Sequence, residues 1–268
     1  MGELMQAIAV FDIDGVIRDV GGSYRRALAD TVEHFTQGAC RPTPQDIDTL
    51  KAEGIWNNDW EGSQELIYRY FEGQGQGRSQ LDLRYGAIVD FFQRRYRGPN
   101  LEQPSQWTGY ISQEPVLVTS DYFEQLSQHH IAWGFFSGAT RGSATYILEQ
   151  RLGLKHPRLV AMEDAPGKPN PTGLFAVVKS LSSDSTQTPI LYIGDTVADM
   201  QTIQKAQQQS PEFQWLAVGI LPPHVSASDT AYISSYARSL TDAGAHVVLP
   251  AVTALTPDCI QQLISQAA

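Results

Sequence analysis

Two carboxylates separated by one residue end the first apolar run of the chain. The run begins at Ala7, and Asp12, Asp14 and Gly15 lie at its end. A short continuous apolar run predicts a strand covered on both faces, as in a parallel sheet flanked by helices. Asp12 then lies at the carboxyl end of that strand, where open α/β sheets bind their ligands. Two carboxylates this close repel each other unless a cation joins them. The pair therefore indicates a site for chemistry, or else an Asp and Gly turn that only caps the strand.

Three more stretches place polar residues directly after an apolar run or in a rigid loop. They contain Ser137 and Gly138, Lys168, and Asp195 and Asp199. A hydroxyl and an amide can donate hydrogen bonds to an anion, and a lysine can offset negative charge. Each stretch alone is a weak signal, but the four occur together in one chain.

In their order along the chain, these stretches resemble the signature of the haloacid dehalogenase superfamily. Its pattern is Asp-x-Asp-Gly, then a Ser or Thr after a strand, then a Lys, then Gly-Asp with an Asp four residues on, and all four parts occur between Asp12 and Asp199. The resemblance implies an α/β fold, with a doubly wound parallel sheet and an inserted α-helical cap, similar to the phosphoglycolate phosphatase-like branch. The dehalogenases of the superfamily lack an aspartate at the position of Asp14, so this residue favours phosphoryl transfer.

A phosphate monoester resists hydrolysis because its charge repels water and its leaving alkoxide is poor. Catalysis therefore requires charge neutralisation, a nucleophile and an acid. Asp12 is the expected nucleophile, which would form an aspartyl-phosphate. Asp14 is the expected general acid and base. Ser137 and the amide of Gly138 would bind the phosphoryl oxygens, and Lys168 would offset the charge shared by Asp12 and the phosphate.

The resemblance also implies a magnesium site. Asp12, Asp195 and the main-chain carbonyl of Asp14 would supply hard oxygen ligands, which Mg²⁺ prefers while it retains several waters. Asp199 would hold a metal-bound water or orient Lys168; the alternative is that it only caps the helix that follows. The expected activity is magnesium-dependent hydrolysis of a small phosphorylated metabolite.

Composition excludes some partners. The chain has 19 Lys and Arg against 29 Asp and Glu, a net charge of -10, and no basic run interleaved with aromatics. Nucleic acid and anionic membranes are therefore not expected as partners. A phosphorylated substrate remains compatible, because a metal and a few local cations set the field of a site. With Cys40 and Cys259 as the only cysteines, no transmembrane run and no signal-peptide pattern, we expect a cytoplasmic protein.

A length of 268 residues suits a core of roughly 150–180 residues with an insert. We assign residues 1–19 and 113–268 to the catalytic core and 20–112 to the cap. The expected cap helices are 23–35 with Ser23 as the N-cap, one that opens at Thr43 and Pro44, 63–71, and 81–96. The expected core elements are helix 119–129, strand 131–136, helix 139–152, strand 158–162, helix 172–181, strand 189–193, helix 197–208, strand 214–218, strand 245–249 and helix 257–266.

The cap is expected to contact the leaving group. A loop from Asn57 to Trp60 combines amides, a carboxylate and an aromatic ring, and Asn58 and Asp59 are the candidates for binding a polyol or sugar. The alternative is a tryptophan-anchored turn. Phosphonate-cleaving relatives use a cap lysine that has no clear counterpart here, where Lys51 is the only one.

Basic residues offer a further hypothesis about the substrate. Arg18, Arg25, Arg69 and Arg84 could bind a second anionic group or form surface ion pairs.

Two other functions stay open. A phosphomutase that resembles β-phosphoglucomutase would use the same aspartates while protecting its aspartyl-phosphate from water. A non-enzymatic member of the superfamily would bind a ligand or a partner. The complete set of Asp12, Asp14, Ser137, Lys168 and Asp195 weighs against the second of these.

Overall fold

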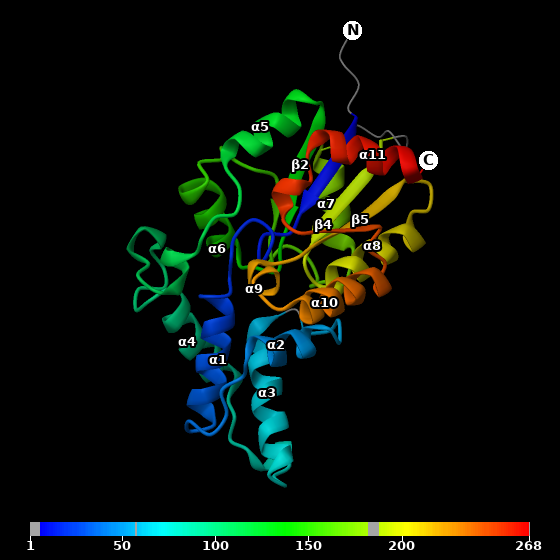
Figure 1. Ribbon diagram of the computed structural model, residues 1–268. Helices are drawn as coiled ribbons and strands as arrows, with labels where there is room; N and C mark the ends of the chain where they lie inside the picture. The colour runs from blue at the N-terminus through cyan, green and yellow to red at the C-terminus, as the bar shows by residue number, and fades with distance from the viewer. Residues whose placement is uncertain (1–5, 57, 182–187, 268) are drawn as a thin grey trace. The chain divides into compact units, whose positions relative to one another are not determined.

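The computed structural model describes residues 6–56, 58–181 and 188–267, and it divides the chain into two units (Figure 1). The sheet unit runs up to Asp19 and resumes at Pro115. The helical unit is Val20–Glu114. The units meet after Asp19 and after Glu114, and the assignment of a catalytic core and a cap stays a prediction. No helix in the described ranges is long and apolar enough to cross a lipid bilayer.

Parallel strands form a six-stranded sheet in the spatial order β3-β2-β1-β4-β5-β6. The strands are β1 Ala7–Phe11, β2 Ile131–Phe136, β3 Leu159–Val160, β4 Ile190–Gly194, β5 Trp215–Ile220 and β6 Val247–Leu249. All six predicted strands are present, so the predicted doubly wound parallel sheet is confirmed. The strand order runs in opposite directions from β1 and β4, which makes this pair the switch point at which such sheets bind ligands.

Helices follow most strands of the sheet unit. They are α5 Ser120–Gln128, α6 Arg141–Thr145, α7 Thr172–Leu181, α8 Val197–Gln209, α9 Pro223–Ser226, α10 Thr230–Asp242 and α11 Pro257–Ala267. Helix α6 continues as a π-helical turn, Tyr146–Arg151, where one unbroken helix is predicted. Helix α10 is not predicted. Among its described residues Leu240 is fully buried.

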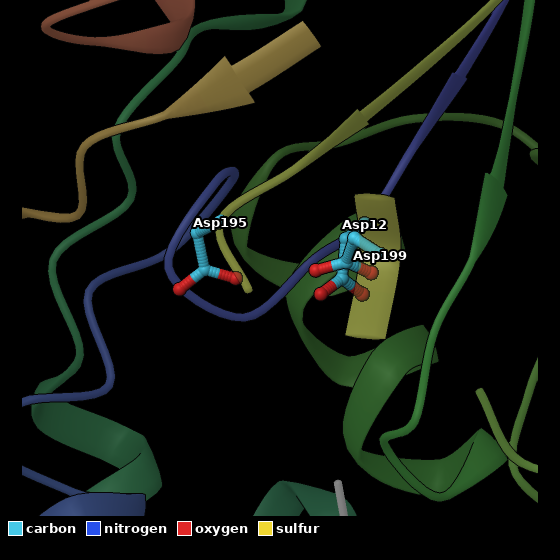
Figure 2. A group of neighbouring side chains, drawn as sticks. All are labelled: Asp12, Asp195 and Asp199. Atoms are coloured by element: carbon cyan, nitrogen blue, oxygen red, sulfur yellow. The ribbon is translucent and has the colours of Figure 1, made fainter. Parts of the chain in front are cut away.

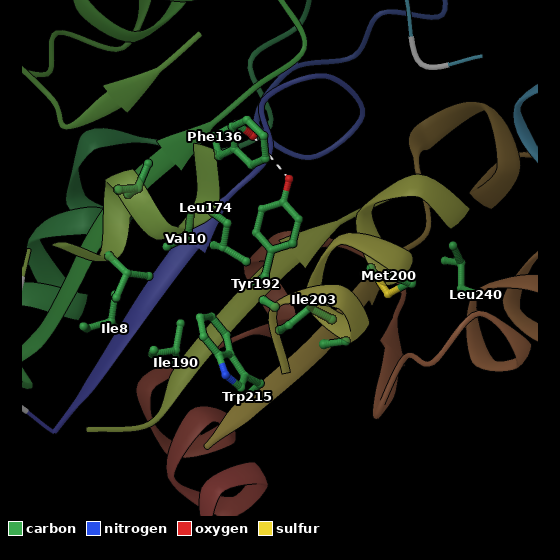
Figure 3. Packing of buried hydrophobic residues seen from close by; sticks show 14 residues of the cluster. Ile8, Val10, Phe136, Leu174, Ile190, Tyr192, Met200, Ile203, Trp215 and Leu240 are labelled. Atoms are coloured by element: carbon green, nitrogen blue, oxygen red, sulfur yellow. Dashed lines mark hydrogen bonds between the residues drawn. The ribbon is translucent and has the colours of Figure 1, made fainter. Parts of the chain in front are cut away.

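The sheet places its side chains alternately against two layers of helices. On one face, Val10, Phe136 and Tyr192 pack in a cluster with residues of α7, α8 and α10 (Figure 3). On the other face, the ring of Phe11 packs 6.1 Å from that of Tyr122 in α5. Neighbouring residues of a strand point to opposite faces, so β1 needs apolar side chains at every position. This explains the uninterrupted run that predicts it.

The register of the sheet brings the ends of β1 and β4 level with each other. Phe11 pairs with Ile193. The next amide, that of Asp12, donates to the carbonyl of Ile193 over 2.8 Å. Asp12 and Asp195 therefore leave the sheet side by side.

The α-helices in the described part of the helical unit are α1 Tyr24–Phe35, α2 Pro44–Lys51, α3 Asp59–Gly73 and α4 Tyr85–Tyr96, and short 3-10 helices lie between and after them. Helix α1 packs against α3 and α4. The rings of Tyr24, the first residue of α1, and Tyr96, the last residue of α4, lie 4.0 Å apart. Thr43 caps α2 as predicted, because its side chain and that of Asp46 bond reciprocally to each other's main-chain amides.

Three predictions for the helical unit are wrong in detail. Ser23 precedes α1, but its hydroxyl donates to Glu114 over 2.5 Å and makes no capping bond. Helix α3 begins at Asp59, four residues earlier than predicted, because the side chain of Asn58 accepts from the amide of Trp60. Helix α4 begins at Tyr85, four residues later than predicted.

The segments that lead into and out of the helical unit pair with each other and form what we call the connecting ribbon, residues 17–19 and 115–117. Ile17 accepts a hydrogen bond from the amide of Leu117 over 2.8 Å, and the amide of Asp19 donates to Pro115 over 2.9 Å. Arg18 forms the antiparallel bridge between these two bonds. The insert therefore departs from and returns to one place in the sheet unit.

Candidate active site

Three aspartates gather at the switch point (Figure 2). Asp12 follows β1, Asp195 follows β4, and Asp199 lies in the first turn of α8. Each offers one carboxylate oxygen, and these oxygens lie within 4.8 Å of one another. All three side chains are buried. The structure thus brings together three of the residues that the sequence predicts for the site.

Two glycines make this close approach possible. Gly15 has a φ of +77°, and a Cβ placed there would lie 2.1 Å from Oδ2 of Asp195. A Cβ on Gly194 would lie 2.3 Å from the Cβ of Asp199. Any other residue at either position would push an aspartate out of the group, and at Gly15 it would also be strained.

Lys168 lies between two of the carboxylates. Its Nζ is 2.8 Å from Oδ1 of Asp12 and 2.7 Å from Oδ1 of Asp199. The contact with Asp199 is a well-aligned hydrogen bond, whereas the contact with Asp12 is an ion pair outside hydrogen-bond geometry. Burial alone would lower the pKa of Lys168, but the charges of Asp12 and Asp199 outweigh it and raise the pKa. The lysine is therefore an ammonium at neutral pH.

The surroundings of Asp12 disfavour its charge. Burial is the largest cause and raises the pKa of Asp12 from its ordinary 3.8 to about 7; Lys168 opposes this shift, while the charges of Asp199 and Asp14 add to it. Asp12 is thus a carboxylate that a further cation would stabilise.

Asp199 uses both of its oxygens inside the protein. Oδ1 accepts from Lys168 and, over 3.0 Å, from the hydroxyl of Tyr192. Oδ2 accepts from the amide of Thr196 over 3.0 Å and from its hydroxyl over 2.6 Å. Burial opposes the ionisation of Asp199, but Lys168 and the bonds from Thr196 lower its pKa. The two predicted alternatives therefore coexist, since Asp199 both orients Lys168 and caps α8.

Tyr192 and Tyr236 are polar groups of the site that the sequence does not single out. The hydroxyl of Tyr192 bonds to Asp199, and burial followed by the charge of Asp199 holds its pKa well above the ordinary value. The hydroxyl of Tyr236, in α10, donates to the main-chain oxygen of Asp195 over 2.9 Å. The sequence signal for Tyr192 is that it lies inside an otherwise apolar strand, because a buried hydroxyl needs a hydrogen-bond partner.

Asp14 does not join the three aspartates. It lies on the loop after β1, a quarter exposed, and pairs with Arg18, whose Nε and Nη2 lie 2.6 and 2.5 Å from its Oδ1. Ser137 is buried at the end of β2, where its hydroxyl oxygen accepts from the amide of Ala139 over 3.0 Å. Gly138 follows it and is half-buried.

The predicted cap residues have partners inside the helical unit. Asn58 caps α3, and Asp59 forms an ion pair of 2.8 Å with Lys51. The sequence predicted a loop between helices for both residues, but Asn58 is the N-cap of α3 and Asp59 is its first residue. Asn57 lies outside the described residues.

Three of the four arginines of interest are paired. Arg18 contacts Asp14, Arg25 contacts Asp48, and Arg69 contacts two glutamates. Arg84 stands directly before α4.

The donor set fits a divalent metal. Lys168 contacts two of the three buried carboxylates, those of Asp12 and Asp199, and a divalent cation would lower the repulsion within the group. Carboxylate oxygens are hard ligands of the kind that Mg²⁺ prefers. Asp199 already spends both oxygens on protein partners, whereas Oδ1 of Asp12 accepts no hydrogen bond.

Comparison with known proteins identifies a family and a curated relative. The family described as haloacid dehalogenase-like hydrolase matches residues 7–207. An imidazoleglycerol-phosphate dehydratase from Phytophthora nicotianae is 27% identical over 253 residues, which are 93% of this chain and 51% of that protein. The chain therefore spans about half the length of this curated relative.

Solved structures share the fold. A phosphonoacetaldehyde hydrolase-like protein from Oleispira antarctica superposes with a TM-score of 0.70 at 17% identity, over 98% of this chain and 94% of that one. Phosphatase Tt82 from Thermococcus thioreducens superposes with a TM-score of 0.60 at 25% identity, over 79% of this chain and 92% of that one.

The raised pKa of Asp12 has a consequence for stability. Between its ordinary pKa of 3.8 and the folded value of about 7, the native state binds more protons at Asp12 than the unfolded state does. Its contribution to the free energy of unfolding therefore falls as pH rises through this range. Asp12→Asn removes this titration. Without metal, the free energy of unfolding of the variant should therefore rise relative to that of the wild type as pH increases from about 5 to about 7.5. Urea denaturation in a chelating buffer measures this; an unchanged difference would mean that Asp12 ionises normally.

Proposed function

This chain belongs to the haloacid dehalogenase-like hydrolases, and we propose that within this family it is a magnesium-dependent phosphatase of a small phosphorylated metabolite. The observation that carries the proposal is the buried group at the switch point. There Asp12 lies within 2.8 Å of Lys168 and close to Asp195, with Asp14 two residues away. The similarity to phosphatase Tt82 supports the same class of reaction.

The proposed reaction has two steps. An oxygen of Asp12 attacks phosphorus, the bond to the leaving alkoxide breaks, and Asp14 gives that alkoxide a proton. Water then attacks the aspartyl-phosphate, Asp14 takes a proton from it, and inorganic phosphate leaves. Lys168 offsets the charge that builds up on Asp12 and the phosphoryl oxygens, and Ser137 and the amide of Gly138 donate hydrogen bonds to those oxygens.

Asp12, Asp195 and the main-chain carbonyl of Asp14 would hold the metal. When bound, Mg²⁺ supplies charge neutralisation for the phosphoryl group and for the carboxylates around it. Asp199 acts through Lys168, which it holds against Asp12. A reducing compartment suits the free thiols Cys40 and Cys259, and we place the enzyme in the cytoplasm.

The name of the curated relative suggests a substrate class to test first. Imidazoleglycerol phosphate is a phosphate monoester of a polyol that carries an imidazole ring. A polyol leaving group also suits the amide and carboxylate of Asn58 and Asp59 in the helical unit. We therefore propose polyol phosphates as the substrate class.

The direct test is a panel of phosphorylated metabolites, imidazoleglycerol phosphate and glycerol phosphates among them, assayed for phosphate release with and without Mg²⁺. We expect magnesium-dependent release from at least one polyol phosphate. Asp12→Asn should abolish it, because the amide is nearly isosteric yet cannot form an acyl-phosphate. Retention of a tenth of the wild-type rate by this variant would contradict the covalent mechanism. An isomerised sugar phosphate without free phosphate would favour the mutase instead.

Asp195 and Asp199 should separate in a magnesium titration of activity. Asp195→Asn removes a proposed ligand and should raise the Mg²⁺ concentration at half-maximal activity by at least about 10–100-fold. Asp199→Asn should raise it less. In the absence of metal, Asp199→Asn should lower the free energy of unfolding, because the amide weakens the contacts to Lys168 and Thr196. Equal magnesium midpoints for the two variants would remove the distinction.

Specificity should depend on the helical unit, because the phosphoryl group is common to all candidate substrates. Asp59→Ala should lower kcat/KM on the native substrate by roughly 1–3 kcal/mol and leave p-nitrophenyl phosphate nearly unchanged. Lys51→Met is the matched control, since it breaks the same ion pair but keeps the carboxylate.

Asn58→Ala should have the same selective effect, together with a loss of about 0.5–2 kcal/mol of helix stability from the missing cap. Equal losses on both substrates in stably folded variants would show that specificity is determined elsewhere.

A further inference from the structure

Arg18 is the largest of the side chains that are almost completely buried, with 0% of its surface exposed. It lies at the start of the connecting ribbon. A guanidinium cannot lose its proton in a protein, so burial at this depth requires a partner. The proposed reaction assigns Arg18 no role, so its burial calls for another explanation.

Asp14 is the acidic partner of Arg18. Nε and Nη2 of Arg18 lie 2.6 and 2.5 Å from the same oxygen, Oδ1 of Asp14. Within the described chain this leaves Oδ2 as the oxygen of Asp14 available to exchange a proton with a substrate. The hydrogen bond from Nε, with Nη2 in ion-pair contact beside it, holds Oδ1 of Asp14 against a planar and rigid guanidinium and so restricts the position of the carboxylate.

The main chain fixes Arg18 in turn. Its carbonyl accepts from the amide of Gly15 over 2.9 Å, and its amide donates to Ile13 over 3.1 Å, which closes the loop that carries Asp14. On its other side, Arg18 bridges to Val116 in the connecting ribbon. The side chain of Arg18 therefore links the carboxylate of Asp14, which is a quarter exposed, to a main chain that is fixed by hydrogen bonds.

We propose that Arg18 is a positioning residue, which holds the carboxylate of Asp14 where it exchanges a proton with the leaving oxygen of the substrate. This inference rests on the proposed function, since it acts through the general acid. Stability alone is a weak reason for such a pair, because a buried ion pair replaced by apolar side chains of similar volume is often no less stable. Orientation of the acid is what apolar packing could not supply.

Two aryl phosphates of similar shape test the proposal without knowledge of the native substrate. The leaving group of phenyl phosphate has a pKa of about 10, as tyrosine does, and needs a proton. The leaving group of p-nitrophenyl phosphate is far more acidic and needs little assistance. Arg18→Met should lower kcat/KM for phenyl phosphate on the order of 10-fold to 100-fold and that for p-nitrophenyl phosphate several-fold less. Arg18→Lys, which keeps the charge without the planar fork, should recover part of the loss.

A double-mutant cycle asks whether Arg18 acts through Asp14. In an Asp14→Asn background, Arg18→Met should cause no further loss on phenyl phosphate. Arg25→Met is the matched control, because it breaks another buried arginine and aspartate pair and should leave the ratio of the two kcat/KM values unchanged. Urea denaturation of every variant confirms that it is folded.

The outcomes separate the two proposals. Equal losses on both substrates in folded Arg18→Met, or an additional loss in the Asp14→Asn background, would overturn the role of Arg18 and leave the phosphatase intact. No phosphate release by the wild type, or full activity of Asp14→Asn on phenyl phosphate, would overturn the proposed function and the inference with it. If Arg18→Met does not fold, Arg18→Lys and the double variant carry the comparison: a ratio unchanged by Arg18→Lys, with the double variant worse than Asp14→Asn, would refute the inference.

Discussion

The burial of three carboxylates at the junction of β1 and β4 is the constraint on which the rest of the site depends. A carboxylate removed from water must be compensated by a cation or by hydrogen bonds. Asp12, Asp195 and Asp199 are all buried, and Lys168 faces two of them. Two carboxylates therefore share one ammonium at the switch point, with the carboxylate of Asp195 beside them.

The protein resolves this conflict unequally. Asp199 receives hydrogen bonds from Lys168, Tyr192 and Thr196, and its pKa falls. In the described part of the chain, the side chain of Asp12 has the ion pair with Lys168 as its compensation, and burial raises its pKa. Neighbouring groups whose pKa values are driven apart commonly have different tasks. Here one carboxylate is stabilised as a permanent anion that fixes the lysine, and the other stays ready to react or to bind a cation.

Prediction from the sequence succeeded where a physical requirement, such as burial of a strand on both faces, produces a pattern in neighbouring residues. Apolar side chains at every position mark the two-sided burial of β1 and β4, and polar residues directly after those strands mark the ligand-binding edge. The sheet and the group of aspartates could therefore be predicted. Asp199 stayed ambiguous because capping and lysine binding use different oxygens of one side chain, which spacing along the chain cannot separate.

Prediction from the sequence failed where a residue's role depends on a contact that only the tertiary structure creates. The partner of Arg18 is set by a closed loop and a ribbon, which an i, i+4 spacing outside a helix does not reveal. Tyr192 looks like any aromatic residue of a buried strand until Asp199 is placed beside it. Asn58 reads as a loop residue, because the helix that it caps starts with an aspartate and a tryptophan rather than with an apolar repeat.

The connecting ribbon also bears on how the chain reaches this structure. Residue Ala7 of β1 pairs with Ile131 of β2, although the entire helical unit separates them in sequence. Closing a loop of that length costs chain entropy before any strand contact compensates for it, and such non-local pairing slows folding. A helical unit that folds first would bring Asp19 and Pro115 within hydrogen-bonding distance, as they are here at 2.9 Å. The long loop would then behave like a short hairpin, and the central strands of the sheet could find each other as though the insert were absent.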